Sequence, residues 1–417
     1  MNTVVVGLGY VGLPLALRAV EVGHDVTGVD VSSVRVAALH DGRSYVDDVS
    51  DEALAGASAT GRWRATDQYE ALDAFDVAVI TVPTPLRDRS PDLSYVEDAA
   101  HSLAAHLTAG ALVVLESTTY PGTTEDIVVP LLEKGSGLRA GEDFLVGYSP
   151  ERIDPGNTVF TLETTPKVVA GIDEASCERT AEFYGAIVKD VVPVSTTRTA
   201  ELTKLLENTF RHVNIALVNE MAIFCRELDV DIWEVIEAAS SKPFGFMPFR
   251  PGPGVGGHCL PIDPAYLSWR VEQVTGRSFR FVEIANDINE HMPDYVVQRV
   301  SLGLNAMCRA VRGSRVLLLG LAYKRNSGDA RESPSVRVAE LLQGLGATVL
   351  AVDPFVQHTA AGSAWEQVEL SAEVVRGSDA VVLLTDHDDC DYRTVQREAR
   401  WILDTRHRLT GANVESL

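Results

Sequence analysis

The amino-acid sequence predicts an α/β protein in which two doubly wound domains are joined by a long central helix. Residues 3–30 alternate a short β-branched run, a helical pattern and a second apolar run, which is the βαβ rhythm of a parallel sheet. An uninterrupted helical pattern follows at residues 199–229, and the βαβ rhythm returns at residue 314. These three observations together predict the fold class.

The first domain is expected to span residues 1–196. After the opening βαβ unit, short apolar runs alternate with helical segments, as in a Rossmann-like, doubly wound domain. We expect its further strands at residues 76–85, 111–118, 143–151, 167–171 and 188–194.

The middle of the chain, residues 197–300, is predicted to be mainly helical. Residues 199–229 carry apolar residues at helical spacing without Gly or Pro, which predicts one long helix between the domains. The segment at residues 242–264, KPFGFMPFRPGPGVGGHCLPIDP, is too rich in Pro and Gly for regular structure. Since loops of this length in compact domains are usually functional or disordered, this segment is a candidate site.

The last part of the chain, residues 301–417, is expected to form a second Rossmann-like domain. The βαβ rhythm predicts its strands at residues 314–324, 348–354, 379–389 and 401–406.

Charge and cysteine content exclude several classes of partner. The 417 residues include 36 Lys and Arg against 59 Asp and Glu, a net charge of −23. This charge would repel phosphate backbones and anionic lipid, so neither nucleic acid nor a membrane is an expected partner. The five cysteines are widely spaced without a CxxC pair, which predicts neither a disulfide framework nor a zinc cluster. With no export signal and no long apolar run, we expect a cytoplasmic location.

Gly7, Gly9 and Gly12 form a GxGxxG motif between the first predicted strand and the first predicted helix. In that context the first Gly makes the tight turn, the second lets a pyrophosphate approach the backbone, and the third lets the helix pack on the strand. The alternative is a glycine turn of some other α/β protein. The motif, including Tyr10 and Val11 within it, therefore predicts a dinucleotide site.

Asp30 ends the second predicted strand, where an acidic residue bonds the ribose 2′-hydroxyl of a dinucleotide. Because a carboxylate would repel a 2′-phosphate, the sequence predicts NAD rather than NADP. Arg35 is either a contact to the adenosine ribose or a solvated helix residue.

Cys259 lies in the Gly-rich segment GVGGHCLPIDP, where few side chains crowd the sulfur. This setting favours a nucleophile over the small buried hydrophobe that is the simpler interpretation of Cys177, Cys225 and Cys308. His258 lies beside it, but adjacent residues point apart in extended backbone and no further ligands flank them. No metal site is predicted.

Two further polar patterns have simple alternatives. Lys204 and Asn208 are four residues apart and share one face of the long predicted helix, where an ammonium and an amide can polarise one oxygen. From the residues alone, a solvated lysine on an exposed helix is the more usual interpretation of this pattern. The acidic run TDHDDCD at residues 385–391 has the composition of a metal cluster, but it follows a strand and is interpreted as a solvated loop.

Together these motifs resemble those of the nucleotide-sugar 6-dehydrogenases, a family that includes UDP-glucose, GDP-mannose, UDP-N-acetylglucosamine and UDP-N-acetylmannosamine dehydrogenases. The resemblance covers nearly the full length. It is carried, in chain order, by GLGYVGLPLA, VPTP, ESTTYPGT, SPERIDPGN, AELTKLLENTFRHVNIALVNE, PGPGVGGHCLPIDP and LLGLAYKRNSGDARESPS.

The resemblance implies a four-electron oxidation of the sugar C6 alcohol to a carboxylate, with two NAD⁺ used in turn and no metal. Cys259 matches the nucleophile that captures the aldehyde as a thiohemiacetal and then holds a thioester. The residues matched to oxyanion stabilisation are Lys204 and Asn208, and those matched to hydrolysis of the thioester are Asp263, Thr118 and Glu151.

The same resemblance implies two sets of binding residues. The residues expected to face the dinucleotide are Thr84, Thr118 and Arg331. Cationic side chains would neutralise a diphosphate in an otherwise acidic protein, so a UDP-sugar is the expected partner. The family's central helix also dimerises, which implies a homodimer. The residues expected to face the nucleotide sugar are Glu151, Arg152, Lys204, Asn208, Arg211, Arg250, Gly256, Lys324 and Arg406.

Departures from the UDP-glucose members indicate the subgroup. Those members usually carry NPEF where this chain has SPERIDPGN, and a Lys where it has Ile262. Both departures favour an N-acetylhexosamine substrate. SPERIDPGN and KPFGFMPF are most similar to the UDP-N-acetylglucosamine enzymes, with UDP-N-acetylmannosamine and UDP-glucose as alternatives. Arg250 stands where an aromatic residue is expected, which is compatible with an altered sugar preference.

Two rival functions explain less of the sequence. A β-hydroxyacid dehydrogenase would share the first domain and a helical second domain, but it would lack the Cys259 loop and the α/β domain that follows. A non-catalytic nucleotide-sugar sensor would not need Cys259, Lys204, Asn208 and Asp263 together.

Overall fold

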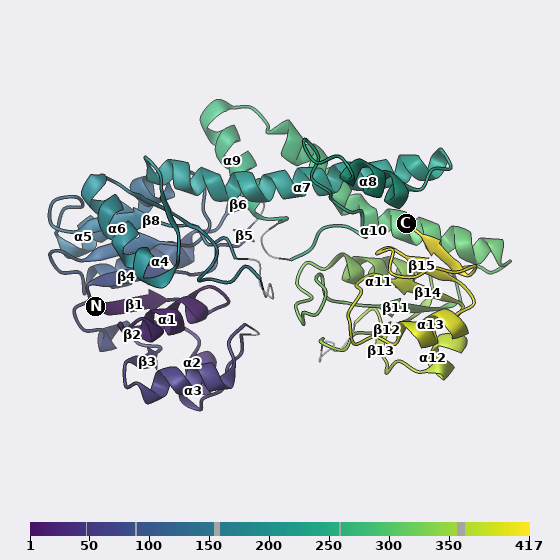
Figure 1. Cartoon of the computed structure of the whole chain (residues 1–417), viewed down its shortest axis with the longest axis horizontal. Coiled ribbons are helices and arrows are strands. Elements are labelled where there is room, and N and C mark those ends of the chain that lie inside the picture. Colours follow the sequence, from purple (N-terminus) through teal and green to yellow (C-terminus); the bar gives the residue numbers. More distant parts are fainter. Residues whose placement is uncertain (47, 88–89, 154–158, 258–259, 357–362) are drawn as a thin grey trace. The chain divides into compact units, whose positions relative to one another are not determined.

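The computed structural model of the chain describes residues 1–46, 48–87, 90–153, 159–257, 260–356 and 363–417. It divides into two compact units, which are described separately. Unit 1 comprises Met1–Glu207 and Ala265–Arg277, and unit 2 comprises Asn208–Pro264 and Ser278–Leu417. The long helix α7 (Thr197–Glu227) begins in unit 1 and ends in unit 2 (Figure 1).

Unit 1 is built on an eight-stranded sheet among the described residues, with strand order β10-β9-β8-β7-β4-β1-β2-β3. The chain reverses order at β1 and β4, as in doubly wound folds, where ligands bind beyond the carboxyl ends of the strands. The strands are β1 (Asn2–Val6), β2 (Asp25–Val29), β3 (Trp63–Thr66), β4 (Val77–Ile80), β7 (Leu112–Leu115), β8 (Leu145–Tyr148), β9 (Lys167–Gly171) and β10 (Val191–Pro193), and a short antiparallel pair, β5 (Leu86–Arg87) and β6 (Ser90–Pro91), lies outside this sheet.

Helices cover both faces of this sheet because its strands are apolar on both sides. One face packs under α1 (Gly12–Glu21), α2 (Ser33–His40), α3 (Asp51–Ala59) and α6 (Glu174–Ile187). The other packs under α4 (Ser94–Ala104) and α5 (Val129–Ser136), the latter preceded by a π-helical turn at Thr124–Val128. The strands between them are buried throughout, as expected of a sheet covered on both faces.

Helix α9 (Asp263–Thr275) contributes most of its length to unit 1, although it follows the Pro/Gly-rich segment in the chain. Its Trp269 ring lies 5.2 Å from the ring of Tyr120, and Arg270 pairs with Asp126 at 3.2 Å. Unit 1 is therefore completed by a segment distant in sequence.

Unit 2 contains a six-stranded sheet of order β13-β12-β11-β14-β15-β16, in which every neighbouring pair is parallel. Helices α10 (Arg280–Ala306) and α11 (Pro334–Gly344) pack on one face, and α12 (Ala372–Arg376) and α13 (Tyr392–Glu398) on the other. Helix α8 (Ile232–Ser240) packs on the C-terminal part of α7. The strands are β11 (Arg315–Leu319), β12 (Thr348–Val352), β13 (Glu366–Gln367), β14 (Ala380–Leu383), β15 (Ile402–Asp404) and β16 (Val414–Ser416).

The predicted fold class is confirmed, with two sheets of parallel strands joined by long helices. The long helix predicted at residues 199–229 is α7, and the described residues at 241–262 form turns and bends, as their Pro and Gly content predicts. One pair in the first sheet differs, because β8 and β9 are antiparallel. The chain returns from β8 to β9 without a crossover helix in its described part, so β9 starts at the edge where β8 ends.

None of the described helices is both long enough and apolar enough to cross a membrane. The division of the chain into domains at residues 196 and 300 stays a prediction.

Candidate active site

The turn between β1 and α1 has the geometry that a GxGxxG motif requires. Gly7 has a φ of +92°, and a Cβ there would lie 2.7 Å from the carbonyl oxygen of Thr81. A Cβ on Gly12 would lie 1.8 Å from the carbonyl oxygen of Gly7, so only Gly lets α1 begin this close to the strand. A Cβ on Gly9 would meet nothing within 4 Å. The fold therefore requires Gly7 and Gly12, whereas Gly9 leaves open space at the turn.

The open side of this turn is the N-terminus of α1. The helix begins after Val11, and among the described residues no side chain caps it. Its first backbone N–H groups are therefore available to an anion, which the helix dipole also favours. Val11 is half-buried, and Tyr10 is 42% exposed beside it. These residues fit the pyrophosphate of a dinucleotide.

Asp30 directly follows β2 and is buried beside the same turn. Its Oδ2 accepts a hydrogen bond from the N–H of Leu8 at 3.0 Å, and its Oδ1 accepts one from the N–H of Ser32 at 2.9 Å. Arg35 lies 3.4 Å from Oδ2, and its guanidinium lies over the ring of Tyr45. Arg35 thus contacts Asp30 and is not simply a solvated helix residue.

The two threonines expected to face the dinucleotide follow neighbouring strands of the same sheet. Thr84 comes after β4 and is buried, and Thr118 comes after β7 and is half-buried. Because β1, β4 and β7 are parallel neighbours, their carboxyl ends meet at one edge, where the glycine turn also lies. The residues of unit 1 that are predicted to contact the dinucleotide therefore gather at that edge.

Glu151 belongs to a buried ionic cluster that extends back to β7 and β9. Its Oε2 pairs with the ammonium of Lys167 at 2.9 Å, and its Oε1 accepts hydrogen bonds from the N–H groups of Arg152 and Ile153. Lys167 is 3% exposed and also pairs with Glu116. The hydroxyl of Tyr184 donates to Oε2 of Glu116 at 2.6 Å. Glu151 is thus held in a fixed orientation by three groups, the Lys167 ammonium and two backbone N–H groups of its own loop.

The two carboxyls of the cluster differ in their pKa values. Burial raises the pKa of Glu116 to about 7, against the opposing charge of Lys167. Burial also acts on Glu151, but the ammonium of Lys167 and hydrogen bonds from Lys167 and Ile153 outweigh it and lower its pKa to about 2. Glu151 is therefore a carboxylate at neutral pH and can accept a hydrogen bond from water, but it has no proton to donate.

Arg152 is engaged within unit 1. Its guanidinium donates to Glu207 at 2.6 Å and to the carbonyl oxygen of Pro166 at 2.7 Å. A phosphate at this residue would compete with the Glu207 carboxylate. Its role toward a nucleotide sugar stays a prediction.

The two polar residues singled out on α7 are both buried. Lys204 is 9% exposed and Asn208 is 5% exposed, whereas Leu206 between them is 63% exposed. This reverses the usual pattern of a surface helix and excludes the solvated alternative for Lys204. An ammonium and an amide one turn apart are thus directed away from solvent.

Within unit 2, Asn208 and Asp263 lie together. The Asn208 amide donates to Oδ2 of Asp263, which is buried at the start of α9. Two residues 55 apart in sequence, both expected in the reaction, are thereby brought into direct contact. Arg211 and Arg250, expected at the nucleotide sugar, are both exposed.

The remaining predicted ligand residues of unit 2 are Lys324, Gly256 and Arg406 for the nucleotide sugar and Arg331 for the dinucleotide. Lys324 is half-buried on this loop. A Cβ on Gly256 would lie 2.7 Å from Cβ of Tyr323, so Gly256 packs directly against the same loop. Arg331 pairs with Asp329 at 2.6 Å. Arg406 follows β15, donates to the carbonyl oxygen of Leu384 at 2.6 Å, and approaches Gly252.

His258 and Cys259 lie outside the described residues, so the predicted nucleophile is placed by the sequence alone. Among the described residues no group of three or more metal-ligating side chains is close enough to hold a metal ion.

Comparison with known proteins decides the family. Three models of the UDP-glucose/GDP-mannose dehydrogenase family match in order: the NAD-binding domain at residues 1–191, the central domain at residues 198–291 and the UDP-binding domain at residues 317–411. A curated UDP-N-acetyl-D-mannosamine dehydrogenase of Pyrococcus horikoshii is 37% identical over 93% of this chain and 90% of its own length. The chain belongs to the UDP-glucose/GDP-mannose dehydrogenase family.

Other family members carry related names. A UDP-N-acetyl-D-glucosamine 6-dehydrogenase of Pseudomonas aeruginosa is 36% identical over 93% of this chain and 91% of its own length. The solved structure of a UDP-D-ManNAc dehydrogenase from Pyrococcus horikoshii is similar to this chain, with a TM-score of 0.90 and 34% identity over 100% of this chain and 99% of that one. The fold is therefore shared over nearly all of both chains.

Membership of the UDP-glucose/GDP-mannose dehydrogenase family confirms the predicted chemistry at a coarse level. The chain is an NAD-dependent nucleotide-sugar 6-dehydrogenase. The family's NAD-binding domain contains the glycine turn and Asp30. Its UDP-binding domain contains Lys324, Arg331 and Arg406.

Sequence reasoning missed the buried partners of the site. Glu116 and Lys167 fix Glu151, yet each lies in or beside an apolar strand where a single charge gives no pattern. The one available signal was that both charges interrupt runs otherwise expected to be fully buried. Buried charges need partners of opposite charge, and Glu116 and Lys167 can supply this partner to each other.

Proposed function

We propose that this family member oxidises C6 of a UDP-N-acetylhexosamine through two successive two-electron steps at Cys259. The observation that best supports this is the inverted burial of α7, on which Lys204 and Asn208 are buried while Leu206 is exposed. A polar pair withdrawn from solvent on a helix is suited to stabilise negative charge that develops on a substrate oxygen.

The dinucleotide would be held by the glycine turn, the N-terminus of α1 and Asp30, which accepts the adenosine ribose hydroxyls. When bound, NAD⁺ supplies the hydride acceptor for each oxidation. Thr84 and Thr118 line the sheet edge on which it would lie.

The chain's own residues would perform the covalent steps. The Cys259 thiolate adds to the C6 aldehyde formed by the first hydride loss, and the resulting thiohemiacetal loses the second hydride to become a thioester. Lys204 and Asn208 stabilise the oxyanions at C6. Water then breaks the carbon–sulfur bond, which regenerates the thiol and releases the carboxylate. In sum, the alcohol, one water and two NAD⁺ give the carboxylate, two NADH and three protons.

Hydrolysis of the thioester needs a positioned water. Glu151 remains ionised at neutral pH, since Lys167 and backbone N–H groups hold its pKa at about 2. It can therefore orient a water through hydrogen bonds, with Thr118 and Asp263 as its proposed partners. Asp263 in turn is oriented by the Asn208 amide.

We propose UDP-N-acetyl-D-mannosamine as the preferred substrate. Proteins named as UDP-N-acetyl-D-mannosamine dehydrogenases predominate among the most similar relatives, including those of Pyrococcus horikoshii and Methanococcus maripaludis. UDP-N-acetyl-D-glucosamine, which the motifs SPERIDPGN and KPFGFMPF favour, is the second candidate and is the substrate named for a relative of 36% identity. UDP-N-acetyl-D-glucosamine, the substrate that the sequence motifs favour, is thus less well supported than UDP-N-acetyl-D-mannosamine.

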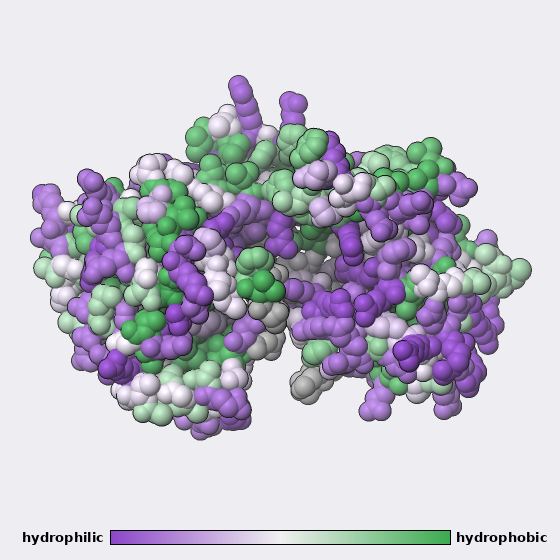
Figure 2. Space-filling view, viewed as in Figure 1, coloured by the Kyte–Doolittle hydropathy of each residue, from purple (hydrophilic) through white to green (hydrophobic). Residues whose placement is uncertain are grey.

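We also propose that the protein is a homodimer through α7. The exposed side of this helix carries large apolar residues at helical spacing, among them Leu206, Leu217 and Phe224 at 63, 54 and 49% exposure. Figure 2 shows hydrophobic residues at the surface over α8 and the C-terminal end of α7. Contiguous exposed apolar surface of this kind marks interfaces in soluble proteins.

The proposed activity is tested by incubating the purified protein with NAD⁺ and a panel of UDP- and GDP-sugars and measuring NADH. We expect the highest kcat/KM with UDP-N-acetylmannosamine. Faster turnover of UDP-glucose under matched conditions would contradict the N-acetylhexosamine proposal.

The covalent mechanism is tested by Cys259→Ser, with Cys308→Ser as the matched control, because Cys308 is an exposed cysteine outside the site. A serine hydroxyl has a far higher pKa than a thiol and cannot supply the anionic nucleophile. We expect Cys259→Ser to release no uronic acid and Cys308→Ser to match the wild type. Normal acid production by Cys259→Ser would remove Cys259 from the mechanism.

A further inference from the structure

The loop that follows β11 carries Lys324 and is bounded by two tight contacts with the segment after β14. Gly320 begins the loop with a φ of +87°, and a Cβ there would lie 2.4 Å from Cβ of Thr385. The hydroxyl of Thr385 donates to the carbonyl oxygen of Ala322 at 2.6 Å. The start of the loop is thus fixed by the first residue of the acidic run at residues 385–391.

Asp353, directly after β12, holds the same start of the loop from the other side. Its side chain is fully buried, and its Oδ2 accepts hydrogen bonds from the N–H groups of Leu321 at 2.7 Å and Ala322 at 2.9 Å. Its Oδ1 accepts from the N–H groups of Phe355 and Val356. Asp353 occupies the position in this sheet that Asp30 occupies in the first, and both carboxylates accept hydrogen bonds from backbone N–H groups of the turn beside them.

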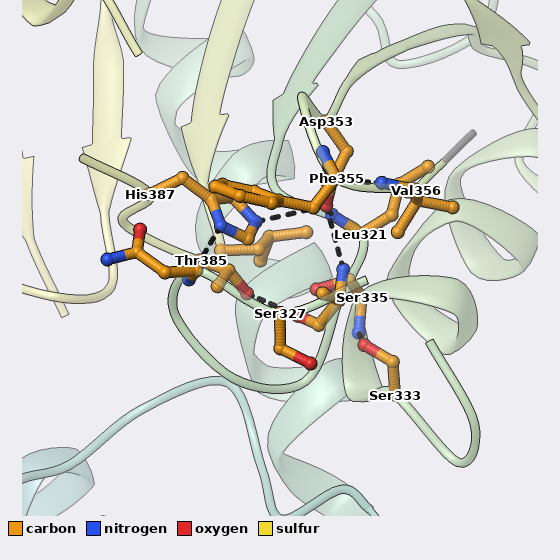
Figure 3. Close-up of polar contacts among 12 residues, drawn as sticks. Leu321, Ser327, Ser333, Ser335, Asp353, Phe355, Val356, Thr385 and His387 are labelled. Carbon is orange, nitrogen blue, oxygen red and sulfur yellow. Dashed lines mark hydrogen bonds and ion pairs between the residues drawn. The ribbon is translucent and has the colours of Figure 1, made fainter. Parts of the chain in front are cut away.

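His387, which Figure 3 shows beside Asp353, connects this anchor to Asn326, which follows Lys324 in the chain. It is 1% exposed, with Nε2 at 3.1 Å from Oδ2 of Asp353 and Nδ1 at 3.0 Å from the backbone N of Asn326. Because a backbone N–H can only donate, Nδ1 accepts and Nε2–H donates to the carboxylate, which assigns the neutral tautomer. One imidazole therefore joins the start of the loop to its end.

Asp388 adds a second connection at the end of the loop. The amide of Asn326 donates to its Oδ2 at 2.7 Å, and the N–H of Asp388 donates back to the Asn326 side-chain oxygen at 2.9 Å. Asn326 has a φ of +56°, which a non-glycine residue holds only when its surroundings fix it. Arg325 also contacts Asp388.

Lys324 thus lies between two anchored points, Ala322 on one side and Asn326 on the other. The neighbouring Tyr323 packs against Gly256, another residue of unit 2 predicted at the nucleotide sugar. Through this loop, the segment after β14 determines where both predicted substrate residues lie.

We propose that His387 and Asp388 are positioning residues for recognition of the nucleotide diphosphate of the substrate by Lys324. The acidic run at residues 385–391 is then neither a metal cluster nor a solvated loop, but the clamp that holds the binding loop in place. This inference rests on the proposed function, since it assumes that a nucleotide sugar binds at Lys324. An ammonium held at one position loses less conformational freedom on binding a diphosphate, so the clamp should act on affinity rather than on the chemical step.

The test compares four variants of the full-length protein. His387→Ala removes the connection, whereas His387→Gln offers an acceptor and a donor at similar separation and should restore it. Asp388→Ala removes the second connection. Asp389→Ala makes the same charge change one residue away, at an exposed side chain, and is the matched control.

We expect His387→Ala and Asp388→Ala to raise the KM for the nucleotide sugar and the Kd for UDP about tenfold, a size typical of coupling through a network. The kcat and the KM for NAD⁺ should stay within about twofold of the wild type, and His387→Gln and Asp389→Ala should resemble the wild type. If His387→Ala does not fold, the comparison of Asp388→Ala with Asp389→Ala decides the question.

Equal KM and UDP affinity in Asp388→Ala and Asp389→Ala would overturn the proposal, as would a His387→Ala variant that loses only thermal stability or only kcat. Failure of the premise that a nucleotide sugar binds is detected separately, because the wild type would then form no NADH with any nucleotide sugar. The Kd for UDP can be measured for each variant without turnover, so this comparison tests the clamp independently of catalysis.

Discussion

Replacing Lys167 by Met should destabilise unit 1 in a pH-dependent way. The ammonium is 3% exposed and pairs with Glu116 and Glu151, which are 0 and 14% exposed. Met keeps most of the side-chain volume but leaves two buried carboxyls without a counter-charge. Breaking a buried pair by removing one partner typically costs about 3–5 kcal/mol. For a unit of this size that corresponds to a fall in Tm of roughly 6–20 °C.

The sign of the pH dependence follows from the carboxyls. In the wild type, the pKa of Glu151 is lowered to about 2, so its contribution is present above the pKa of the unfolded chain and is lost as the pH falls toward 2. In Lys167→Met this contribution disappears, and burial raises the pKa of both carboxyls. A raised carboxyl pKa destabilises the folded state increasingly as the pH rises. The variant should therefore lose more stability at pH 8 than at pH 5.

The matched control is Lys189→Met. Lys189 pairs with Glu163 at 3.5 Å on the surface, with 62 and 42% of the two side chains exposed. Such a pair contributes about 0–1 kcal/mol. Thermal unfolding of wild type and both variants at pH 5 and pH 8 provides the comparison. Equal melting of the two variants, or a larger loss for Lys167→Met at pH 5, would refute the assignment of this cluster.

Three further predictions concern the cofactor turn and the exposed helix face. Gly12→Ala should lower the free energy of unfolding by about 3 kcal/mol, because its Cβ would lie 1.8 Å from the Gly7 carbonyl oxygen. Gly9→Ala should fold normally but raise the KM for NAD⁺ about tenfold, since its methyl group enters the open space of the turn. Equal stability of the two variants in urea unfolding would contradict this. Asp30→Asn should raise the kcat/KM for NADP⁺ relative to NAD⁺ roughly tenfold, because the repulsive carboxylate is lost while Arg35 remains beside it; an unchanged ratio would count against Asp30 as the ribose contact. Leu217→Glu should convert a dimer to a monomer in sedimentation, whereas Leu345→Glu, at 46% exposure outside α7, should not; a wild-type monomer would exclude the proposed interface.

The fold and the dinucleotide turn could be predicted because their signals are local. A glycine that must have a positive φ, a strand before it and an acid after the next strand are all close in sequence. The long helix α7 could likewise be predicted, because 31 residues without Gly or Pro leave few alternatives. The short edge strands β13 and β16 were not predicted, since two or three residues carry no periodicity.

The connections within the site could not be predicted, because they join residues far apart in the chain. Lys204 had the same sequence pattern as a solvated lysine, and only its burial separates the two interpretations. The acidic run at residues 385–391 has the sequence pattern of a solvated loop, although His387 within it is buried against Asp353. Burial of a polar residue depends on which elements the fold packs around it, and that information is not local.

The most direct test of the account is the number of NADH molecules formed per nucleotide sugar consumed, measured together with the identity of the product. With UDP-N-acetylmannosamine as the limiting substrate, four-electron oxidation through Cys259 predicts two NADH and a uronic acid. One NADH per sugar, with an aldehyde or a keto sugar as the final product, would contradict it.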